Sequence, residues 1–483
     1  MSTTTPKKVR DLRGGWRRAL AVLVPVPAAL VAAEFALTPY GLFASPTEQL
    51  AAASAAPGRV ALVTWLVLAG LLLGIPAAMA AAWAVRRSAP RLALAGGILT
   101  VVGFALSITV PSSELLAAAA VQRGTDSATF ERVATAVAGH PAVGTTTIAF
   151  LAAQAIGLLL LGLALWRTPS APRWLGAVLA SSGLLHVALS ASSVTAAASW
   201  ALTAVGLVGV SVVLLRQSDD EFDLPPTGVV HAATDPRPRH APGDPRDVRR
   251  TWQWLLALSA PVMAAGIAVL RFTLPFNTLD TPDEAFSKLV ANPTFTSAQV
   301  WFGFLTPVVI SGVLAVLWVT RRRVPVLATV AGVLCVLGYT ALAAADSVSP
   351  VLADVVAHGG LDTASVRPIA AALEAMPQPT TAVTVFVIGH LAGTVLLGIA
   401  LWRSRVLPAW VGIALAVSQP VHLVSAMTGN HPLDLAAWGA TALCMGLAGA
   451  AVLRMSPDEF DLPPAPAQPL AAPAVTADLP APG

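Results

Sequence analysis

Charged side chains are scarce in this sequence. Asp, Glu, Lys and Arg together make up 11% of its 483 residues, whereas soluble domains carry about 25%. Hydrophobic residues make up 56%. A chain of this length that folded into soluble domains would need far more polar surface to cover them. The composition therefore excludes a soluble enzyme and predicts an integral membrane protein that has the lipid bilayer as its main partner.

Cysteines and catalytic motifs are also few. Cys335 and Cys444 lie inside apolar stretches without neighbouring ligand residues, which excludes a disulfide framework and a zinc site. The net charge of +4 comes from short basic runs between apolar stretches, so no nucleic-acid partner is expected. The sequence contains no GxxxxGK[ST], HExxH or GxSxG motif. No catalytic residue and no metal site is therefore predicted, and an enzyme is disfavoured.

Long apolar runs are abundant. A membrane-spanning helix needs about 20 such residues, whereas the strands of a membrane barrel are only about 10 residues long. The sequence therefore predicts an all-α protein with about twelve transmembrane helices. They lie near residues 17–37, 60–85, 92–110, 144–166, 174–193, 197–215, 252–274, 299–320, 324–345, 381–402, 410–427 and 433–453.

Segments of the first half of the chain recur in the second. LGLALWRT at 161–168 returns as LGIALWRS at 397–404, and DEFDLPP at 220–226 returns unchanged at 458–464. Six spans per copy would give both copies the same orientation, so we expect two parallel six-helix repeats. The predicted divisions are a basic cytoplasmic tail at 1–15, repeat 1 at 16–226, a cytoplasmic linker at 227–250, repeat 2 at 251–464 and a disordered Ala/Pro-rich cytoplasmic tail at 465–483.

The positions of the basic residues predict the orientation. Most of the 29 lysines and arginines fall in the N-terminal tail and in alternate loops. Because basic loops stay in the cytoplasm, we expect both termini there, in a bacterial plasma membrane. The first apolar run resembles a secretory signal, but its counterpart beginning at Trp252 cannot be one, so the run is predicted to remain as a span.

The outer loops carry helix-start signals. Ser45 with Glu48, and Thr281 with Glu284, have capping-box spacing, and Asp126 and Asp362 open further helical stretches. We therefore expect short helices in these loops. Two roles remain open for them: amphipathic helices lying on the outer leaflet, or a lid or receptor surface over a central cavity.

Two histidines are predicted to meet inside the membrane. His390 precedes Trp402 by 12 residues, and His422 follows Trp410 by 12. On adjacent antiparallel helices both would stand ~18 Å from the level of these two tryptophans, at 1.5 Å per residue.

The corresponding positions in the first repeat are Gln154 and His186. For Gln154, His186, His390 and His422 three readings remain open. They form interhelical hydrogen bonds, they line a path for protons or a polar substrate, or His390 and His422 bind a haem.

A further pair is predicted from opposite charges at corresponding positions. Glu34 and Arg271 lie near the outer ends of the first and seventh spans. We expect an ion pair bridging the repeats, the alternative being that each side chain reaches the headgroups independently.

The segment Gly389–Val424, with its weaker copy at Ala153–Val187, resembles a motif of uncharacterised multi-pass membrane proteins of high-GC bacteria, which implies a bacterial inner membrane. The predicted architecture is distantly similar to that of major facilitator transporters.

Three functions remain open from the sequence. The first is a secondary-transporter-like permease for a small solute, with a polar site between its helices. The second is a scaffold or sensory subunit that binds a protein partner through the outer-loop helices or the DEFDLPP segments, which otherwise serve as turn-rich exits from the last spans. The third is a haem-binding redox subunit. The oligomeric state also remains open.

Overall fold

The computed structural model describes residues 9–188, 192–227, 244–345 and 348–465. These residues form helices and no strand. Below, residues 9–227 are called the N-terminal half and residues 244–465 the C-terminal half. Most of the predicted linker and nearly all of the predicted C-terminal tail lie outside the described residues, as do the first eight residues.

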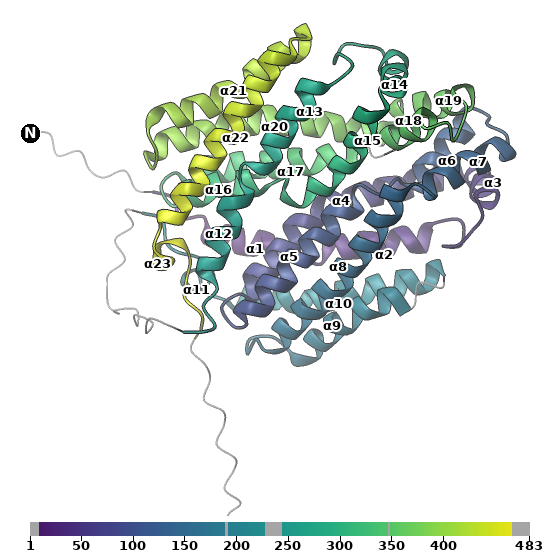
Figure 1. Cartoon of the computed structure of the whole chain (residues 1–483). Coiled ribbons are helices and arrows are strands. Elements are labelled where there is room, and N and C mark those ends of the chain that lie inside the picture. The colour runs from purple at the N-terminus through teal and green to yellow at the C-terminus, as the bar shows by residue number, and fades with distance from the viewer. Residues whose placement is uncertain (1–8, 189–191, 228–243, 346–347, 466–483) are drawn as a thin grey trace, which may run out of the picture.

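The N-terminal half contains eleven helices along its described residues (Figure 1). They are α1 (Arg13–Leu23), α2 (Val26–Leu37), α3 (Pro46–Ala55), α4 (Pro57–Val85), α5 (Pro90–Ser107), α6 (Ser113–Gln122), α7 (Ser127–Ala138), α8 (Pro141–Trp166), α9 (Arg173–Ala188), α10 (Ser193–Arg216) and α11 (Asp219–Phe222).

The C-terminal half follows a similar order. Its helices are α12 (Arg249–Ser259), α13 (Val262–Thr273), α14 (Pro282–Val290), α15 (Pro293–Phe302), the 3₁₀ helix η1 (Gly303–Val308), α16 (Ser311–Thr320), α17 (Pro325–Ala345), α18 (Ser349–Ala357), α19 (Thr363–Glu374), α20 (Pro377–Ser404), α21 (Ala409–Thr428), α22 (His431–Arg454) and α23 (Pro457–Phe460).

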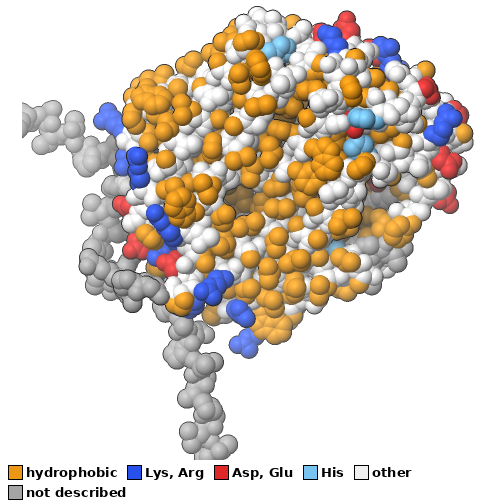
Figure 2. Space-filling view, in the orientation of Figure 1, with side chains coloured by type: hydrophobic (Ala, Val, Ile, Leu, Met, Phe, Trp, Pro, Cys, Tyr) orange, Lys and Arg blue, Asp and Glu red, His pale blue; other side chains and the backbone are white. Residues whose placement is uncertain are grey.

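Eleven helical segments of the described residues are long and apolar enough to cross a bilayer. This confirms the prediction of an all-α, multi-pass membrane protein. The remaining predicted span corresponds to α9, of which 16 residues are described. Charged side chains gather at the two ends of the molecule, and hydrophobic side chains cover the side between them (Figure 2), as a lipid-facing surface requires.

Prolines break some spans and leave others continuous. Pro25 separates α1 from α2, and Pro261 separates α12 from α13. Pro307 lies in η1, between α15 and α16. These interruptions follow from the missing N–H of proline and from the clash of its ring with the preceding turn. Pro76, by contrast, lies inside α4, which continues on both sides of it.

Glycines allow the closest helix crossings. At the crossing of α17 and α20, a Cβ added to Gly389 would lie 2.6 Å from the Cα of Gly338. At the crossing of α5 and α8, a Cβ on Gly157 would lie 2.6 Å from the backbone nitrogen of Thr100. Such contacts between small residues supply much of the packing energy of membrane helices, because lipid offers no hydrophobic drive for association.

The loop helices pack on one another at one end of the molecule. Helices α3, α6 and α7 of the N-terminal half and α14, α18 and α19 of the C-terminal half share one hydrophobic core, and we call this group the cap (Figure 1). Phe130, Leu352 and Ile369 are fully buried in it. The loop helices therefore build a helical layer shared by the two halves.

The cap helices begin as their sequences indicate. Ser45 with Glu48, and Thr281 with Glu284, form complete capping boxes. The backbone N–H of Ser45 donates to the Glu48 carboxylate and lowers its pKa. The backbone N–H of Thr281 lowers the pKa of Glu284 in the same way. Both boxes were predicted from spacing alone, and both are confirmed.

A buried polar contact ties the two halves together beside the cap. Asp354 on α18 is 6% exposed, and its Oδ2 lies 2.8 Å from Nε2 of His140, the residue that caps α8. The Ser297 hydroxyl donates to the other carboxylate oxygen at 2.6 Å. A carboxylate buried this deeply is stable only with such partners.

At the opposite end, which we call the arginine end, each half contacts the other through its DEFDLPP segment. Arg86, after α4, donates from Nε and NH2 to the two oxygens of Asp461 at 2.7 and 2.8 Å. In the reverse direction Arg321, after α16, contacts Asp223 at 3.4 Å. The side chain of Phe222, inside the first segment, is buried.

Aromatic contacts accompany these crossing ion pairs. The indole N–H of Trp83 donates to the carbonyl of Phe222, and that of Trp318 donates to the carbonyl of Phe460. The two indoles meet edge to face with their centroids 5.2 Å apart. Since much of each DEFDLPP segment contacts the rest of the chain, the segments act as internal connectors between the halves, which leaves little of them for a protein partner.

Candidate functional site

The two histidines predicted to meet lie side by side. His390 is on α20 and His422 on α21, and their ring centroids are 5.7 Å apart. Helices α20 and α21 run against each other because small residues line their contact: a Cβ on Gly398 would lie 2.4 Å from the backbone nitrogen of Ala416. The loop between the two helices is short, so they are antiparallel, as the spacing of the tryptophans predicts.

His422 belongs to a chain of polar contacts that the sequence did not indicate. Its Nδ1 lies 2.6 Å from Oδ1 of Asp434, which is in the first turn of α22. The other oxygen of Asp434 accepts a hydrogen bond of 2.7 Å from Nε of Arg271 on α13. The Asp434 side chain is 1% exposed. We call Arg271, Asp434, His422 and His390 the polar chain.

Asp434 is the functional candidate that the sequence analysis missed. It follows His422 by 12 residues and stands close to the start of an apolar run. A carboxylate in that place resembles an ordinary helix-start residue, favoured by the partial positive charge of the helix N-terminus. The only signal was a single acidic residue, one turn into a span, on the helix next to a buried histidine.

Trp438 adds a second contact to His422. Its indole Nε1 lies 3.1 Å from the same Nδ1 that faces Asp434. A ring nitrogen carries either a proton or a lone pair, so only one of these contacts can be a full hydrogen bond at a time. The Asp434 carboxylate and the Trp438 indole therefore compete for one nitrogen of His422.

His390 differs from His422 in having an unsatisfied nitrogen. Its Nδ1 donates to the backbone carbonyl of Phe386 at 2.7 Å, which leaves Nε2 as an acceptor. That Nε2 is buried and has no hydrogen-bond partner among the described residues. The ring stacks on Phe386, with centroids 4.1 Å apart, and lies nearly parallel to Trp438 at 6.1 Å. A buried acceptor without a partner costs free energy and so calls for an explanation.

The predicted residues of the N-terminal half are arranged differently. His186 on α9 has both nitrogens engaged, Nδ1 with Ser199 Oγ at 2.8 Å and Nε2 with Thr203 Oγ1 at 3.0 Å, both on α10. Gln154 on α8 is buried, and neither atom of its amide has a partner among the described residues. His186 therefore fits the reading of interhelical hydrogen bonding, whereas His390 does not.

The structure gives Arg271 a different partner from the one predicted. Arg271 pairs with Asp434 inside its own half, because α13 packs along α22. Glu34 lies on α2, which packs on α4 and α10, and it is close to Glu114 and Tyr40. The proposed bridge between Glu34 and Arg271 is therefore replaced by a pair within the C-terminal half.

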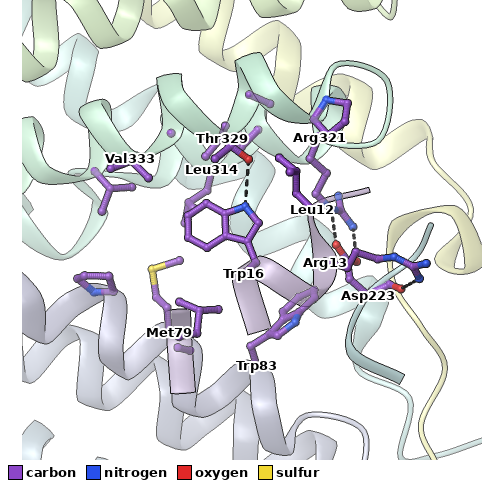
Figure 3. Close-up of a pocket in the computed structure, with 18 of the residues that line it drawn as sticks. Leu12, Arg13, Trp16, Met79, Trp83, Asp223, Leu314, Arg321, Thr329 and Val333 are labelled. Carbon is purple, nitrogen blue, oxygen red and sulfur yellow. Dashed lines mark hydrogen bonds and ion pairs between the residues drawn. The ribbon is translucent and has the colours of Figure 1, made fainter. Parts of the chain in front are cut away.

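A large cavity lies elsewhere, between the two halves (Figure 3). Its volume is about 480 Å³, and α1 and α4 face α16 and α17 across it. None of the four predicted polar residues lines it. Its walls are almost entirely apolar, and the indole of Trp16 crosses it to donate to Thr329 Oγ1 at 3.0 Å.

A haem does not fit between His390 and His422. A porphyrin with these residues as axial ligands would have to separate α20 from α21. Those helices touch at small residues, and a Cβ on Gly412 would lie 2.5 Å from the backbone nitrogen of Trp402. No cluster of metal-binding side chains occurs among the described residues either.

Comparisons with family models, curated proteins and solved structures found no match for the chain.

Proposed function

We propose that the chain is a secondary-transporter-like permease of a bacterial plasma membrane, and that protonation of its polar chain controls it. The observation that carries this proposal is the continuous contact from Arg271 through Asp434 to His422, with His390 beside it. Ionisable groups inside spans are costly, and they commonly mark paths for protons or substrates.

Charge and burial support a role for the polar chain beyond packing. For simple interhelical contact, neutral groups such as the hydroxyls around His186 suffice. The C-terminal half instead buries a carboxylate beside a guanidinium that is only partly exposed, and it leaves His390 Nε2 unsatisfied. Burying such a pair in place of apolar residues brings little stability. A group that gains or loses a proton during function accounts for that cost.

Correspondences between the two halves support two parallel six-helix repeats, with α9 as the twelfth span. Helix α5 packs along α8 as α17 packs along α20, and α8 packs along α9 as α20 packs along α21. Arg86 and Arg321 follow corresponding helices, and each contacts the DEFDLPP segment of the other half. With the arginine end in the cytoplasm, this arrangement also satisfies the positive-inside rule.

In this proposal, transport requires the two halves to move against each other around the cavity that separates them. The crossing ion pairs hold the halves together at the arginine end, and the contact of His140 with Asp354 does so at the cap. Proton exchange at His422 and Asp434 would change the charge between α21, α22 and α13. That change would favour one arrangement of the halves over another.

Transport is tested in inside-out vesicles that contain the protein and hold a pH gradient reported by a fluorescent amine dye. A panel of amino acids, sugars, and lipophilic anions and cations is added one at a time. We expect at least one solute to dissipate the gradient with the wild-type chain and not with Asp434→Asn. Glu34→Gln, which removes a carboxylate from a span outside the polar chain, serves as the control. Equal dissipation with Asp434→Asn, or no active solute, would contradict the proposal.

The cap favours one alternative, a scaffold or sensory subunit that binds a partner. Its helices form a folded layer with its own core, which is more than a set of connecting loops requires. On this alternative, a protein would copurify with the wild-type chain and be lost when surface residues of α7 and α19 are replaced. The response of the polar chain to protons would then be absent.

A further inference from the structure

We propose that the cavity between α1, α4, α16 and α17 holds an acyl chain of an anionic membrane phospholipid, with its headgroup at the arginine end. This binding site is separate from the polar chain, none of whose members lines the cavity. The inference therefore stands whether or not the protein transports a solute.

The size and lining of the cavity fit an apolar occupant. Its volume of about 480 Å³ falls within the range of roughly 300–1,000 Å³ found for small-molecule sites. Its walls are apolar side chains such as Met79, Leu314 and Val333 (Figure 3). Leu73 lines it as well. Water gains few hydrogen bonds in such a space, whereas a hydrocarbon chain fills it at little cost.

The depth of the cavity matches one leaflet. Along α17 its lining extends from Pro325 to Leu337, ~18 Å at 1.5 Å per residue. Along α4 it extends from Trp83 to Leu73, ~15 Å on the same scale. One leaflet contributes about half of a hydrocarbon core ~30 Å thick. The cavity therefore spans the depth that the acyl chains of one leaflet occupy.

Charge at the mouth selects the headgroup. The polar lining residues at the arginine end include three arginines and two aspartates: Asp11, Arg13, Asp223, Arg321 and Arg322. Arg13 pairs with Asp11 and with Asp220. Among the lining residues, Arg321 and Arg322 then stand beside a single aspartate, Asp223, which favours an anionic headgroup over a zwitterionic one. The position agrees with lipid binding, because basic pockets between spans are common sites for anionic headgroups.

The ion pair at this mouth is weaker than its counterpart on the other half. Arg321 and Asp223 are 3.4 Å apart and 18% and 17% exposed, whereas Arg86 and Asp461 are 2.7 Å apart and 7% and 6% exposed. A guanidinium at 3.4 Å from its carboxylate can also donate a hydrogen bond to a phosphate oxygen at little cost. Asymmetry of this kind is expected where only one of two related surfaces binds a ligand.

The test uses the full chain in detergent and native mass spectrometry, with phosphatidylglycerol or phosphatidylcholine of identical acyl chains added in steps. Val333→Trp places a bulky side chain in the cavity. Val330→Trp is the matched control, since Val330 lies on the same helix, is similarly exposed and does not line the cavity. Arg322→Gln removes a charge at the mouth, and Arg323→Gln removes a neighbouring charge that does not line the cavity.

We expect the wild-type chain to retain one phosphatidylglycerol molecule in preference to phosphatidylcholine. Val333→Trp should lose it and Val330→Trp should keep it. Arg322→Gln should weaken the preference about five-fold, the effect of one basic residue at an anionic surface, and Arg323→Gln should leave it nearly unchanged. Equal retention of both lipids by the wild-type chain, or undiminished binding to both Val333→Trp and Arg322→Gln, would overturn the proposal. A folded elution profile and wild-type helicity of each variant are required, and Arg322→Gln keeps the test decisive if Val333→Trp misfolds.

Discussion

Arg86 and Asp461, which are 375 residues apart in sequence, form a two-point ion pair across the two halves of the protein, with donor–acceptor distances of 2.7 and 2.8 Å. The guanidinium also lies over the ring of Trp83, 3.4 Å from its centroid. Both side chains are buried. The two halves are therefore joined at the arginine end by a desolvated charge pair, whose loss has measurable consequences.

Arg86→Gln should destabilise the protein by about 3–5 kcal/mol, because it leaves the Asp461 carboxylate buried without its partner. Arg321→Gln is the matched control, and its longer and more exposed pair predicts about 0–1 kcal/mol. Thermal unfolding in a mild detergent measures both. Similar losses for the two variants would mean that the difference in geometry has no energetic consequence.

His390→Phe and His186→Phe should differ in their effect on stability. Phenylalanine at 390 removes the unsatisfied Nε2 while preserving the stack on Phe386, so stability should stay within about 1 kcal/mol of wild type or rise. Phenylalanine at 186 removes two hydrogen bonds to α10 and should cost about 1–3 kcal/mol. Unfolding temperatures compare the two, and a larger loss for His390→Phe would show that His390 acts mainly in structure.

Gly389→Ala should destabilise the crossing of α17 and α20. The added methyl would lie 2.6 Å from the Cα of Gly338, so the helices must separate, at a cost of about 1–3 kcal/mol. Gly439→Ala on α22 is the control, since no atom lies within 4 Å of its added Cβ. There alanine should be neutral or slightly stabilising, because it favours helix. The same loss in both variants would refute the close crossing.

Acid should destabilise the cap, because Asp126 and Asp362 accept hydrogen bonds at the N-termini of α7 and α19. Hydrogen bonds from the backbone N–H of Thr129 lower the pKa of Asp126, and bonds from the hydroxyl and then the backbone N–H of Ser365 lower that of Asp362. A lowered pKa gives stability that is present above the ordinary value of 3.8 and is lost as the pH falls through the folded value. Pepsin cleavage within α7 and α19 should therefore rise as the pH falls below 3.8.

Asp126→Asn with Asp362→Asn provides the control for that experiment. Asparagine still caps a helix but does not titrate in this range, so the pH dependence of cleavage should flatten relative to wild type. If the double variant showed the wild-type profile, the two aspartates would not be the source of the pH dependence.

The sequence was sufficient for eleven of the twelve predicted spans, the capping boxes and the proximity of His390 to His422, because each follows from local periodicity or spacing along one or two helices. The partner of Arg271 was not predictable in this way. Glu34 and Asp434 were both acidic residues in spans, and only the packing of α13 on α22 selects Asp434.

The crossing of the DEFDLPP segments was hidden for a related reason. Since the two segments are identical, Arg86 could have paired with Asp223 in its own half as readily as with Asp461 in the other. The packing of the loop helices into the cap was not predictable either, because an amphipathic helix has the same pattern of residues on a leaflet as on a protein core.

The most direct test of the central claim, that protonation of the polar chain moves the two halves, is a distance measurement between spin labels on exposed positions 15 and 403. These belong to opposite halves at the arginine end, and Cys335 and Cys444 are first replaced by serine. We predict two distance populations whose ratio changes between pH 8 and pH 5 in the wild-type background and stays fixed in Asp434→Asn. A single distance that is unaffected by pH, or the same pH response with Asp434→Asn, would contradict the account.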